Sequence, residues 1–397
     1  MTNSVTATKH LLRTRSRYAA NALFDALTDP RPRDGSDVPW RAEAMTSAWL
    51  TANICSQVPG AAVTNVIVDG GHEGSSIRRK ITVEYNAAGV DAGLPVHLFA
   101  KSSPTWLTRL ASSAEIARAE SEFLRQKAHL DIETPTLAYG AVDRATGRMI
   151  ELFVDLVAES GAVFFDWTTT IDRRQADQVA DTLGVLHGSL AAEVAAGKFS
   201  WLPVYGGRIT RGDQNGLLNA HETALDRCGD LLPTTLLAER DRIWPAVLRN
   251  VRVDAGRAQT VIHSDVHLGN WYETASGRIG LADWQCVSVG HWARDVAYAF
   301  STLLAVDDRR AWERDLFDRY LDVVQSRSGM RIAVDSAWCD YRRYLVNALL
   351  SWTPTLVPTT TMPDMQPLEM STLMLKRIGS AIVDLDALDA CEMSGVA

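Results

Sequence analysis

The sequence lacks several features that would assign it directly to a class of protein. No run of eighteen apolar residues is present, so a membrane-spanning helix is not expected. The five cysteines form no C-x-x-C pair, which argues against a paired-thiolate metal site or a redox disulfide and favours a reducing cytoplasm. The basic N-terminal segment has no apolar core of the secretory kind, and we expect a surface helix there.

Excess positive charge is also missing. Forty basic residues against forty-eight acidic ones give a net charge of -8, which repels a phosphate backbone, so nucleic acid is not an expected partner. The 397 residues are 46% hydrophobic and 22% charged, a composition typical of folded proteins. A chain of this length predicts two lobes or domains.

The residue patterns divide the chain into a β-rich part and a helical part. Three β-rich runs within 63–101 (VTNVIV, IRRKITVEY and VHLFAK) predict an antiparallel unit, and TLAYGAV and MIELFVDL predict two more strands. Helices are expected at Trp40–Cys55 and 113–130. Further helices are expected at 174–196, 215–228, 235–250, 291–305, 308–327, 334–352 and 366–390.

These elements predict an α+β fold with a small antiparallel β-lobe and a larger, mainly helical lobe. We expect a helical extension over 1–60, a first lobe over 61–154 and a helical lobe over 155–397. Residues 200–216 are polar and rich in glycine, and they are interpreted as either a mobile lid or an ordinary connecting loop.

Polar residues gather after two short strands of the helical lobe. HSDVHLGN, residues 263–270, follows the strand TVI, and Asp283 follows the strand IGLA. A carboxylate, an amide oxygen and a second carboxylate near strand ends suit phosphoryl transfer, which needs a carboxylate near the attacking hydroxyl and hard oxygen ligands for Mg²⁺.

The same residues resemble the aminoglycoside phosphotransferase and choline kinase-like proteins, which share the protein-kinase fold. Their signature is H-G-D-x-H-x-x-N followed by D-[FW]; this chain has HSDVHLGN and DWQ, so Ser264 replaces the usual glycine. The runs GSSIRRKITVEY, LFAKSS, ARAESEF and LADWQ look most like the ecdysteroid-kinase-like branch. The resemblance spans roughly residues 64–325.

The resemblance implies an ATP- and Mg²⁺-dependent phosphotransferase and assigns roles by position. Asp265 becomes the base or positioner for the acceptor hydroxyl, and Asn270 and Asp283 become Mg²⁺ ligands. Lys101, on its strand, would reach the α- and β-phosphates and be held by a Glu of the next helix. Glu115, Glu120 and Glu122 all qualify by periodicity, and the family's E-x-x-F/Y spacing favours Glu120.

Weaker assignments concern the nucleotide and the surroundings of the loop. The glycine-rich turn would place backbone at Gly74 and Ser75 over phosphates, and backbone groups from Phe153 to Asp155 would meet the adenine edge. Around the loop, His263 is expected to brace it, Asp295 to bond its backbone, and His187 to pack. His267 is expected either to approach the γ-phosphate or to be a loop histidine whose hydrogen bonds are satisfied within the protein. The tryptophans near the motif are expected in the core: Trp271, Trp284 and Trp292.

Two alternatives stay open at this point. A metal-dependent hydrolase would use His263, Asp265 and His267 as zinc ligands, but it leaves Lys101 unexplained. A non-catalytic nucleotide-binding protein of the same fold would be expected to lack one of the groups that this chain retains. The favoured function is a cytoplasmic small-molecule kinase that phosphorylates a hydroxyl of a metabolite, antibiotic or lipid-like alcohol; the acceptor and the oligomeric state are left open.

Overall fold

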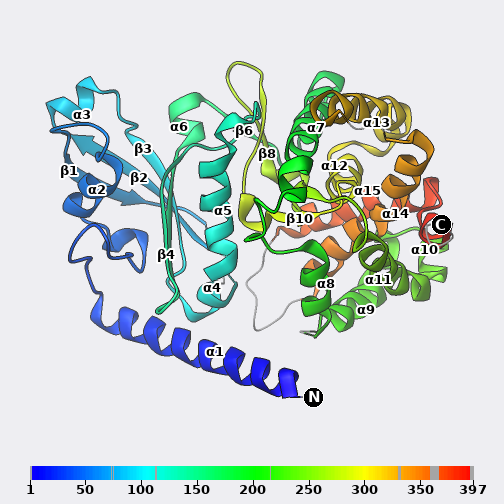
Figure 1. Cartoon of the computed structure of the whole chain (residues 1–397), viewed down its shortest axis with the longest axis horizontal. Helices are drawn as coiled ribbons and strands as arrows, with labels where there is room; N and C mark the ends of the chain where they lie inside the picture. The colour runs from blue at the N-terminus through cyan, green and yellow to red at the C-terminus, as the bar shows by residue number, and fades with distance from the viewer. Residues whose placement is uncertain are drawn as a thin grey trace. The chain divides into compact units, whose positions relative to one another are not determined.

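The computed structural model describes residues 2–72, 74, 76–111, 114–214, 216–329, 332–357 and 366–393 (Figure 1). Its residues form two compact units. The first unit takes in the described residues of Met1–Lys127 and Pro135–Ala162, and the second those of Ala128–Thr134, Val163–Pro358 and Gln366–Ala397. None of the described helices combines the length and the apolar composition that crossing a bilayer requires.

The first unit is built on one antiparallel sheet of five strands in the order β1-β2-β3-β5-β4. The strands are β1 (Val63–Asp69), β2 (Ile77–Tyr85), β3 (His97–Ser102), β4 (Leu137–Asp143) and β5 (Arg148–Val154). All five coincide with the predicted strands to within two residues, because each is a short run rich in β-branched and aromatic residues between turn-forming residues.

Alternation along β3 gives the two faces of this sheet different coverings. Leu98 and Ala100 point into an apolar core that includes Trp49 and Leu50. Lys101 points to the opposite face, where its ammonium meets Glu120 of the next long helix. The helices of this unit are α1 (Thr2–Thr28), α2 (Ser47–Ile54), α3 (Ala87–Asp91), α4 (Trp106–Ala111), α5 (Ala114–Gln126) and α6 (Leu156–Ser160), with a 3₁₀ turn at Ala42–Ala44. A further 3₁₀ turn, Lys127–His129, begins in this unit and ends in the second.

The helix predicted at Trp40–Cys55 begins later than expected. The Thr46 hydroxyl accepts the N–H of Trp49 and caps α2, so the helix begins at Ser47 rather than near Trp40. The helix α4 was not predicted at all. It is too short to show the periodicity on which such a prediction depends.

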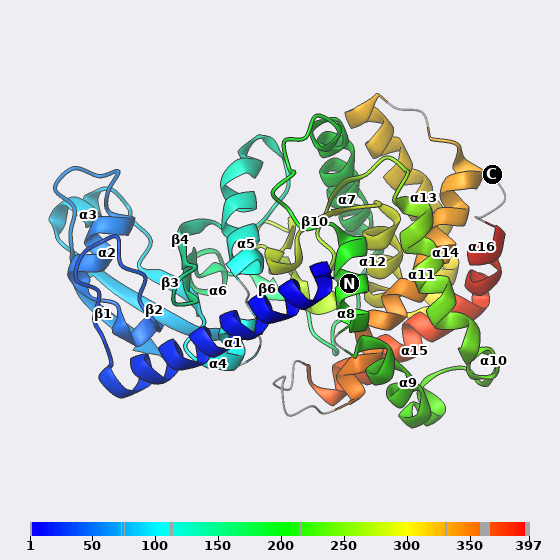
Figure 2. The same ribbon diagram turned by 60° about the horizontal axis from the view of Figure 1, so that its bottom comes forward.

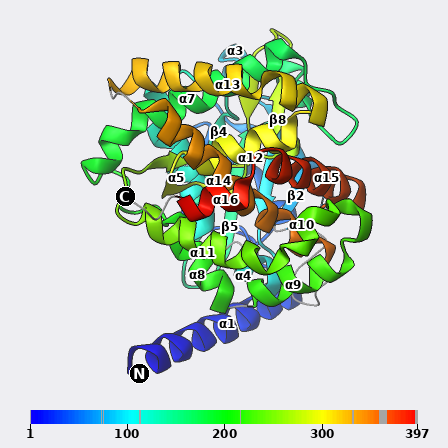
Figure 3. The same ribbon diagram turned by 90° about the vertical axis from the view of Figure 1, so that its right-hand side faces the viewer.

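The second unit is mainly helical (Figure 3). Its long helices α7 (Arg173–Ala195) and α13 (Val306–Ser328) pack along each other, as do α12 (Ala293–Leu303) and α14 (Val334–Trp352). The remaining elements are β6 (Val163–Phe164), α8 (Tyr205–Gln214), α9 (Leu217–Arg227), α10 (Thr234–Ala238), α11 (Ile243–Asp254), β7 (Thr260–Ile262), β8 (Trp271–Glu273), β9 (Ile279–Leu281), β10 (Ser288–Gly290), α15 (Leu368–Asp384) and α16 (Ala387–Met393).

The interpretation of residues 200–216 as an ordinary connecting loop is wrong over most of its length, because α8 occupies Tyr205–Gln214, while the lid stays a prediction. Tyr205 is buried, and a side chain at Gly206 would meet a methyl group of Val251 at 2.8 Å. The glycine therefore permits close packing of α8 against α11 rather than marking a loop. Packing of this kind overrides the low helix propensity of glycine.

Candidate active site

Two short β-structures in the second unit bring the expected catalytic loop and the segment after Asp283 together. β7 pairs with β10, and β8 pairs with β9, both antiparallel. The loop His263–Asn270 leaves β7 and ends in a 3₁₀ turn, Leu268–Asn270, while Asp283 follows β9 and precedes a second turn, Trp284–Cys286. The N–H of Ala282 donates to the carbonyl of Asn270 at 2.8 Å, which ties the two segments directly.

Asp265 and Asn270 lie side by side in the loop. The Asn270 Nδ2 donates to the carbonyl of Asp265 at 2.7 Å and approaches its carboxylate Oδ2 at 3.4 Å. Because the nitrogen of the amide is committed in this way, its oxygen points elsewhere and can serve as a ligand. The other carboxylate oxygen of Asp265 accepts the hydroxyl of Tyr298 at 3.3 Å.

Asp283 takes up a left-handed backbone conformation, with φ 62° and ψ 59°. Aspartate tolerates this region better than most residues. Burial raises the pKa of the Cys286 thiol to about 12, and the negative charges of both Asp265 and Asp283 contribute. Asp283 follows Ala282, which is bonded to Asn270, and Asn270 is bonded to Asp265, so the two aspartates lie in the same neighbourhood. Carboxylate and amide oxygens are the ligands that Mg²⁺ prefers, so the donor set fits this ion.

The histidine cluster does not fit a zinc site. The Nδ1 of His263 accepts the N–H of Asp265 at 3.2 Å, and its Nε2 donates to the carbonyl of Ala282 at 3.0 Å, so both ring nitrogens are used. His267 likewise accepts the N–H of Gly269 through Nδ1. Within the described residues, no group of three or more His, Cys, Asp or Glu side chains could hold a metal. The expected bracing role of His263 is confirmed.

A buried carboxylate holds the start of the loop. Asp295, at the beginning of α12, accepts the N–H of His263 at 2.6 Å and that of Ser264 at 2.9 Å, as the sequence predicted. His187 is more than a packing residue, because its Nε2 lies 3.4 Å from Asp295 and its Nδ1 lies 2.9 Å from the hydroxyl of Tyr320. Burial opposes the charge of Asp295, but the hydrogen bond from His187 and the nearby Arg294 keep its pKa below the usual range.

Three residues around the loop were missed at the sequence level: Ser288, Arg294 and Tyr298. Arg294 is buried, donates to the carbonyl of Ser264 at 3.0 Å and stacks over the ring of Tyr298 at 4.2 Å. The Ser264 hydroxyl lies 2.5 Å from that of Ser288. Arg294 and Tyr298 lie one residue before and three residues after Asp295 on α12. That spacing is the only signal in the sequence that could have identified them.

In the first unit, Lys101 and Glu120 form the predicted pair. The Lys101 ammonium donates to both carboxylate oxygens of Glu120, at 2.9 and 3.0 Å, and the two residues are 6% and 1% exposed. Glu122 instead accepts from Gln126 on its own helix. The side chain of Glu115 lies outside the part of the chain that the structure describes.

Backbone groups of the first unit that were expected to contact the nucleotide bond other residues of the protein. The N–H of Gly74 donates to the carbonyl of Ser76 at 3.1 Å, and Ser75 lies outside the described residues. The N–H of Asp155 donates to the carbonyl of His97 at 3.0 Å, and its carboxylate caps α6, so this N–H is not available to an adenine edge. The ring of Phe153 lies 5.2 Å from the Lys101 ammonium.

A five-stranded antiparallel sheet with a buried Lys–Glu pair and a helical unit with an Asp–Asn loop are the parts of a protein-kinase-like fold. A model of the phosphotransferase enzyme family matches residues 98–332, which is more than half of the chain. The chain therefore belongs to this family and is a phosphotransferase. The finer placement in the ecdysteroid-kinase-like branch stays a prediction.

Solved structures with the same fold have little sequence in common with this chain. A protein assigned as an aminoglycoside phosphotransferase from Ralstonia eutropha is 11% identical, with a TM-score of 0.51 over 87% of this chain and 97% of that one. The ethanolamine kinase of Plasmodium vivax is 12% identical, with a TM-score of 0.46 over 82% and 83%. The choline kinase of Streptococcus pneumoniae is 14% identical, with a TM-score of 0.40 over 84% and 98%. A search of curated proteins found no significant match.

Proposed function

We propose that the protein is an ATP-dependent kinase that transfers the γ-phosphoryl group to a hydroxyl of a small molecule, with Asp265 as the catalytic base. One observation carries the proposal: the carboxylate of Asp265 is held between Asn270 and the Tyr298 hydroxyl, in a loop whose backbone is tied to a buried Asp295. A carboxylate whose orientation is fixed in this way can accept the proton of the substrate hydroxyl, and it suits a reaction whose rate depends mainly on how the reacting groups are positioned.

In the proposed step, the acceptor oxygen forms a bond to the γ-phosphorus, and the bond from that phosphorus to the bridging oxygen of ADP breaks. The proton of the acceptor hydroxyl passes to the carboxylate of Asp265. Tyr298 donates to the other oxygen of the same carboxylate and so orients it. Burial raises the pKa of Tyr298 well above its usual value, so its phenol stays protonated and can act only as a donor to Asp265.

Asn270 and Asp283 are the proposed ligands of Mg²⁺, which when bound neutralises charge on the transferred phosphate. Lys101, held by Glu120, is the proposed partner of the α- and β-phosphates. The net charge of -8 does not favour an anionic nucleotide, so these local positive charges have to provide the attraction.

A screen for release of the nucleoside diphosphate against hydroxylated metabolites, run with ATP (release of ADP) and with GTP (release of GDP), tests the proposal. We expect the enzyme to release ADP from ATP in the presence of one class of acceptor, and we expect chelation of Mg²⁺ to abolish this release. The isosteric variant Asp265→Asn should bind nucleotide as the parent does and lose on the order of 10³-fold in kcat. Retained turnover in this variant would contradict the role of Asp265. Tight nucleotide binding with no release for any acceptor would instead favour the non-catalytic alternative.

A further inference from the structure

The helix α1 has two faces of different character. Tyr18, Ala22 and Asp25, spaced by four and three residues, are buried against the first unit. Leu23, Phe24 and Leu27 lie on the opposite side and are 62%, 57% and 76% exposed. Figure 2 shows the helix in blue, with α4 against it. A helix with one face docked normally presents polar residues on the other, so the exposed apolar residues need an explanation.

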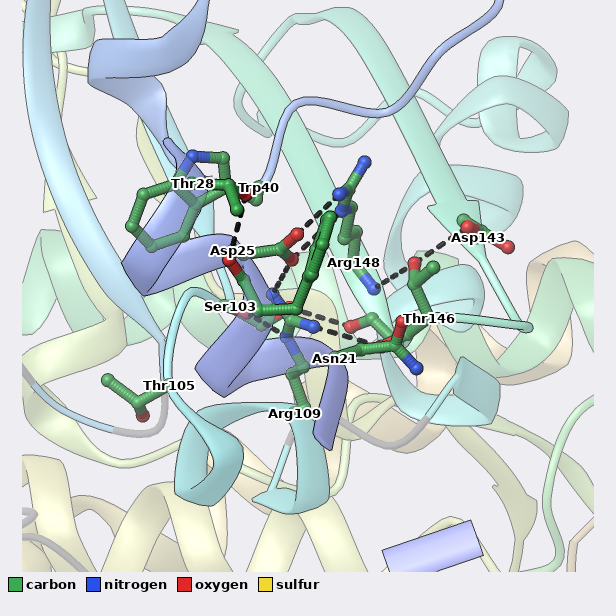
Figure 4. A network of polar contacts seen from close by, with 12 residues as sticks. Asn21, Asp25, Thr28, Trp40, Ser103, Thr105, Arg109, Asp143, Thr146 and Arg148 are labelled. Atoms are coloured by element: carbon green, nitrogen blue, oxygen red, sulfur yellow. Dashed lines mark hydrogen bonds and ion pairs between the residues drawn. The ribbon is translucent and has the colours of Figure 1, made fainter. Parts of the chain in front are cut away.

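A buried ionic anchor fixes which side of α1 faces outward (Figure 4). The carboxylate of Asp25 accepts Arg109 Nη2 at 2.6 Å and Arg148 Nε at 3.0 Å. Tyr18 packs over Gly147, where any side chain would meet its ring at 2.9 Å. Rotation of α1 about its axis would bury the apolar face only by withdrawing Asp25 from two arginines. The exposed face is therefore presented by the fold itself.

The outward face continues toward the N-terminus as a basic stripe. Successive members of one series along α1 are four, three, four and three residues apart, so all five lie on one side of the helix: Arg13, Arg17, Ala20, Phe24 and Leu27. Both arginines are exposed, and Arg17 gives one bond to the carbonyl of Arg144. The first 24 residues contain four Lys and Arg residues and no acidic residue, in a chain of net charge -8.

We propose that α1 docks this face, Arg13, Arg17, Ala20, Leu23, Phe24 and Leu27, on an anionic phospholipid surface. A helix whose apolar residues lie beside cations lodges at the boundary between head groups and acyl chains, with its axis in the plane of the membrane. Each exposed cation near such a surface adds an attraction that a neutral surface does not provide. The local positive charge of α1 matches a negative surface, although the protein as a whole is acidic.

Two other occupants fit the face less well. Three large side chains offer on the order of 300 Å² to a second copy, whereas a stable interface buries about 800 Å² on each partner. A protein partner would need a groove for these residues, because the face is the convex side of a single helix. A lipid surface accepts a convex apolar ridge without any such complementarity.

Sedimentation of the full chain with lipid vesicles tests the proposal. We expect binding to vesicles of phosphatidylcholine mixed with phosphatidylglycerol, weak or no binding to phosphatidylcholine alone, and loss of binding at high salt. Leu27→Asp should weaken binding about tenfold or more. Ala26→Asp is the matched control, because Ala26 is exposed on the same turn but lies off the face, and it adds the same charge.

Several outcomes would overturn the proposal. Equal losses in Leu27→Asp and Ala26→Asp, with both variants folded by circular dichroism, would show that only net charge matters. Equal binding to both kinds of vesicle, or binding to neither, would exclude an anionic lipid surface. A dimer in solution that Leu27→Asp dissociates would assign the face to a second copy. Arg13→Ala gives an independent measurement, and we expect it to lower binding to anionic vesicles without changing the unfolding temperature.

Discussion

Lys101 and Glu120 form a buried pair in which one ammonium meets both oxygens of one carboxylate, at 2.9 and 3.0 Å. Their side chains are 8% and 2% exposed, so neither charge has water as a substitute partner. Removal of one charge from such a pair leaves the other desolvated and uncompensated. The pair therefore serves both the stability of the first unit and the orientation of Lys101.

We predict that Glu120→Gln lowers kcat/KM for ATP at least about tenfold and destabilises the protein by about 3 kcal/mol. Glu122→Gln is the control, because Glu122 lies two residues away on the same helix and bonds Gln126 rather than Lys101. It should change kcat/KM less than about twofold. Steady-state kinetics with varied ATP measure the difference, and equal effects of the two variants would contradict the assignment of Glu120.

The anchor of α1 gives a second prediction. The side chain of Arg109 is fully buried and depends on Asp25 for its only ion pair among the described residues. We expect Asp25→Asn to destabilise the protein by about 3–5 kcal/mol, since a buried guanidinium loses its counter-charge. Asp37→Asn should cost about 1 kcal/mol or less, because its partner Arg33 is 85% exposed. Urea unfolding of both variants provides the comparison.

Ser264 has a positive φ of 70° and stands at the glycine position of the signature H-G-D-x-H-x-x-N that the sequence resembles. Both Ser264→Gly and Ser264→Ala lose the bond to Ser288, but only alanine keeps the strained backbone. We therefore predict that the alanine variant is less stable than the glycine variant by about 1 kcal/mol. Thermal unfolding of the two variants isolates the backbone contribution. Equal stability would show that the loop relaxes without cost.

His221 is buried, with Nδ1 2.7 Å from the Thr353 hydroxyl, and burial lowers its pKa to about 4, with Arg240 adding to the effect. The unfolded chain takes up a proton near pH 6.5, before the folded protein does, so the free energy of unfolding should fall as the pH drops from about 6.5 to about 4. The contribution of His221 to this fall in the free energy of unfolding is about 3 kcal/mol. Burial also lowers the pKa of His291 to about 4 and that of His263, so His221→Gln should reduce the slope of this part of the stability profile without removing it. An unchanged slope in urea unfolding would assign the whole effect to the other groups.

Local residue patterns predicted most of the features that depend on a single short segment of the chain. The five strands of the first unit are short β-rich runs between turn-forming residues, and HSDVHLGN places Asp265 and Asn270 within one loop, so a single segment determines their proximity. The choice of Glu120 over Glu122 came from the resemblance to a family, and the geometry of Lys101 confirms it. Periodicity alone does not separate two residues that flank the same face.

Contacts between distant segments were not predictable in this way. Tyr298 reaches Asp265 across 33 residues, and nothing in its neighbourhood marks it as different from other core tyrosines. Gly206 looked like a loop residue because its packing partner, Val251, lies on a different helix. Each of these contacts depends on the packing of two elements against each other, whereas a residue pattern along the chain describes only one element at a time.

The left-handed backbone of Asp283 limits which residues evolution can place there. Asparagine and glycine tolerate such a conformation, and each is one nucleotide substitution away from an aspartate codon. Either change removes the carboxylate while leaving the turn intact. With the Mg²⁺ role proposed for Asp283, a folded but inactive descendant is therefore one mutation away at position 283, whereas loss of Glu120 also costs stability. Among relatives that have lost activity, we expect position 283 to have changed first.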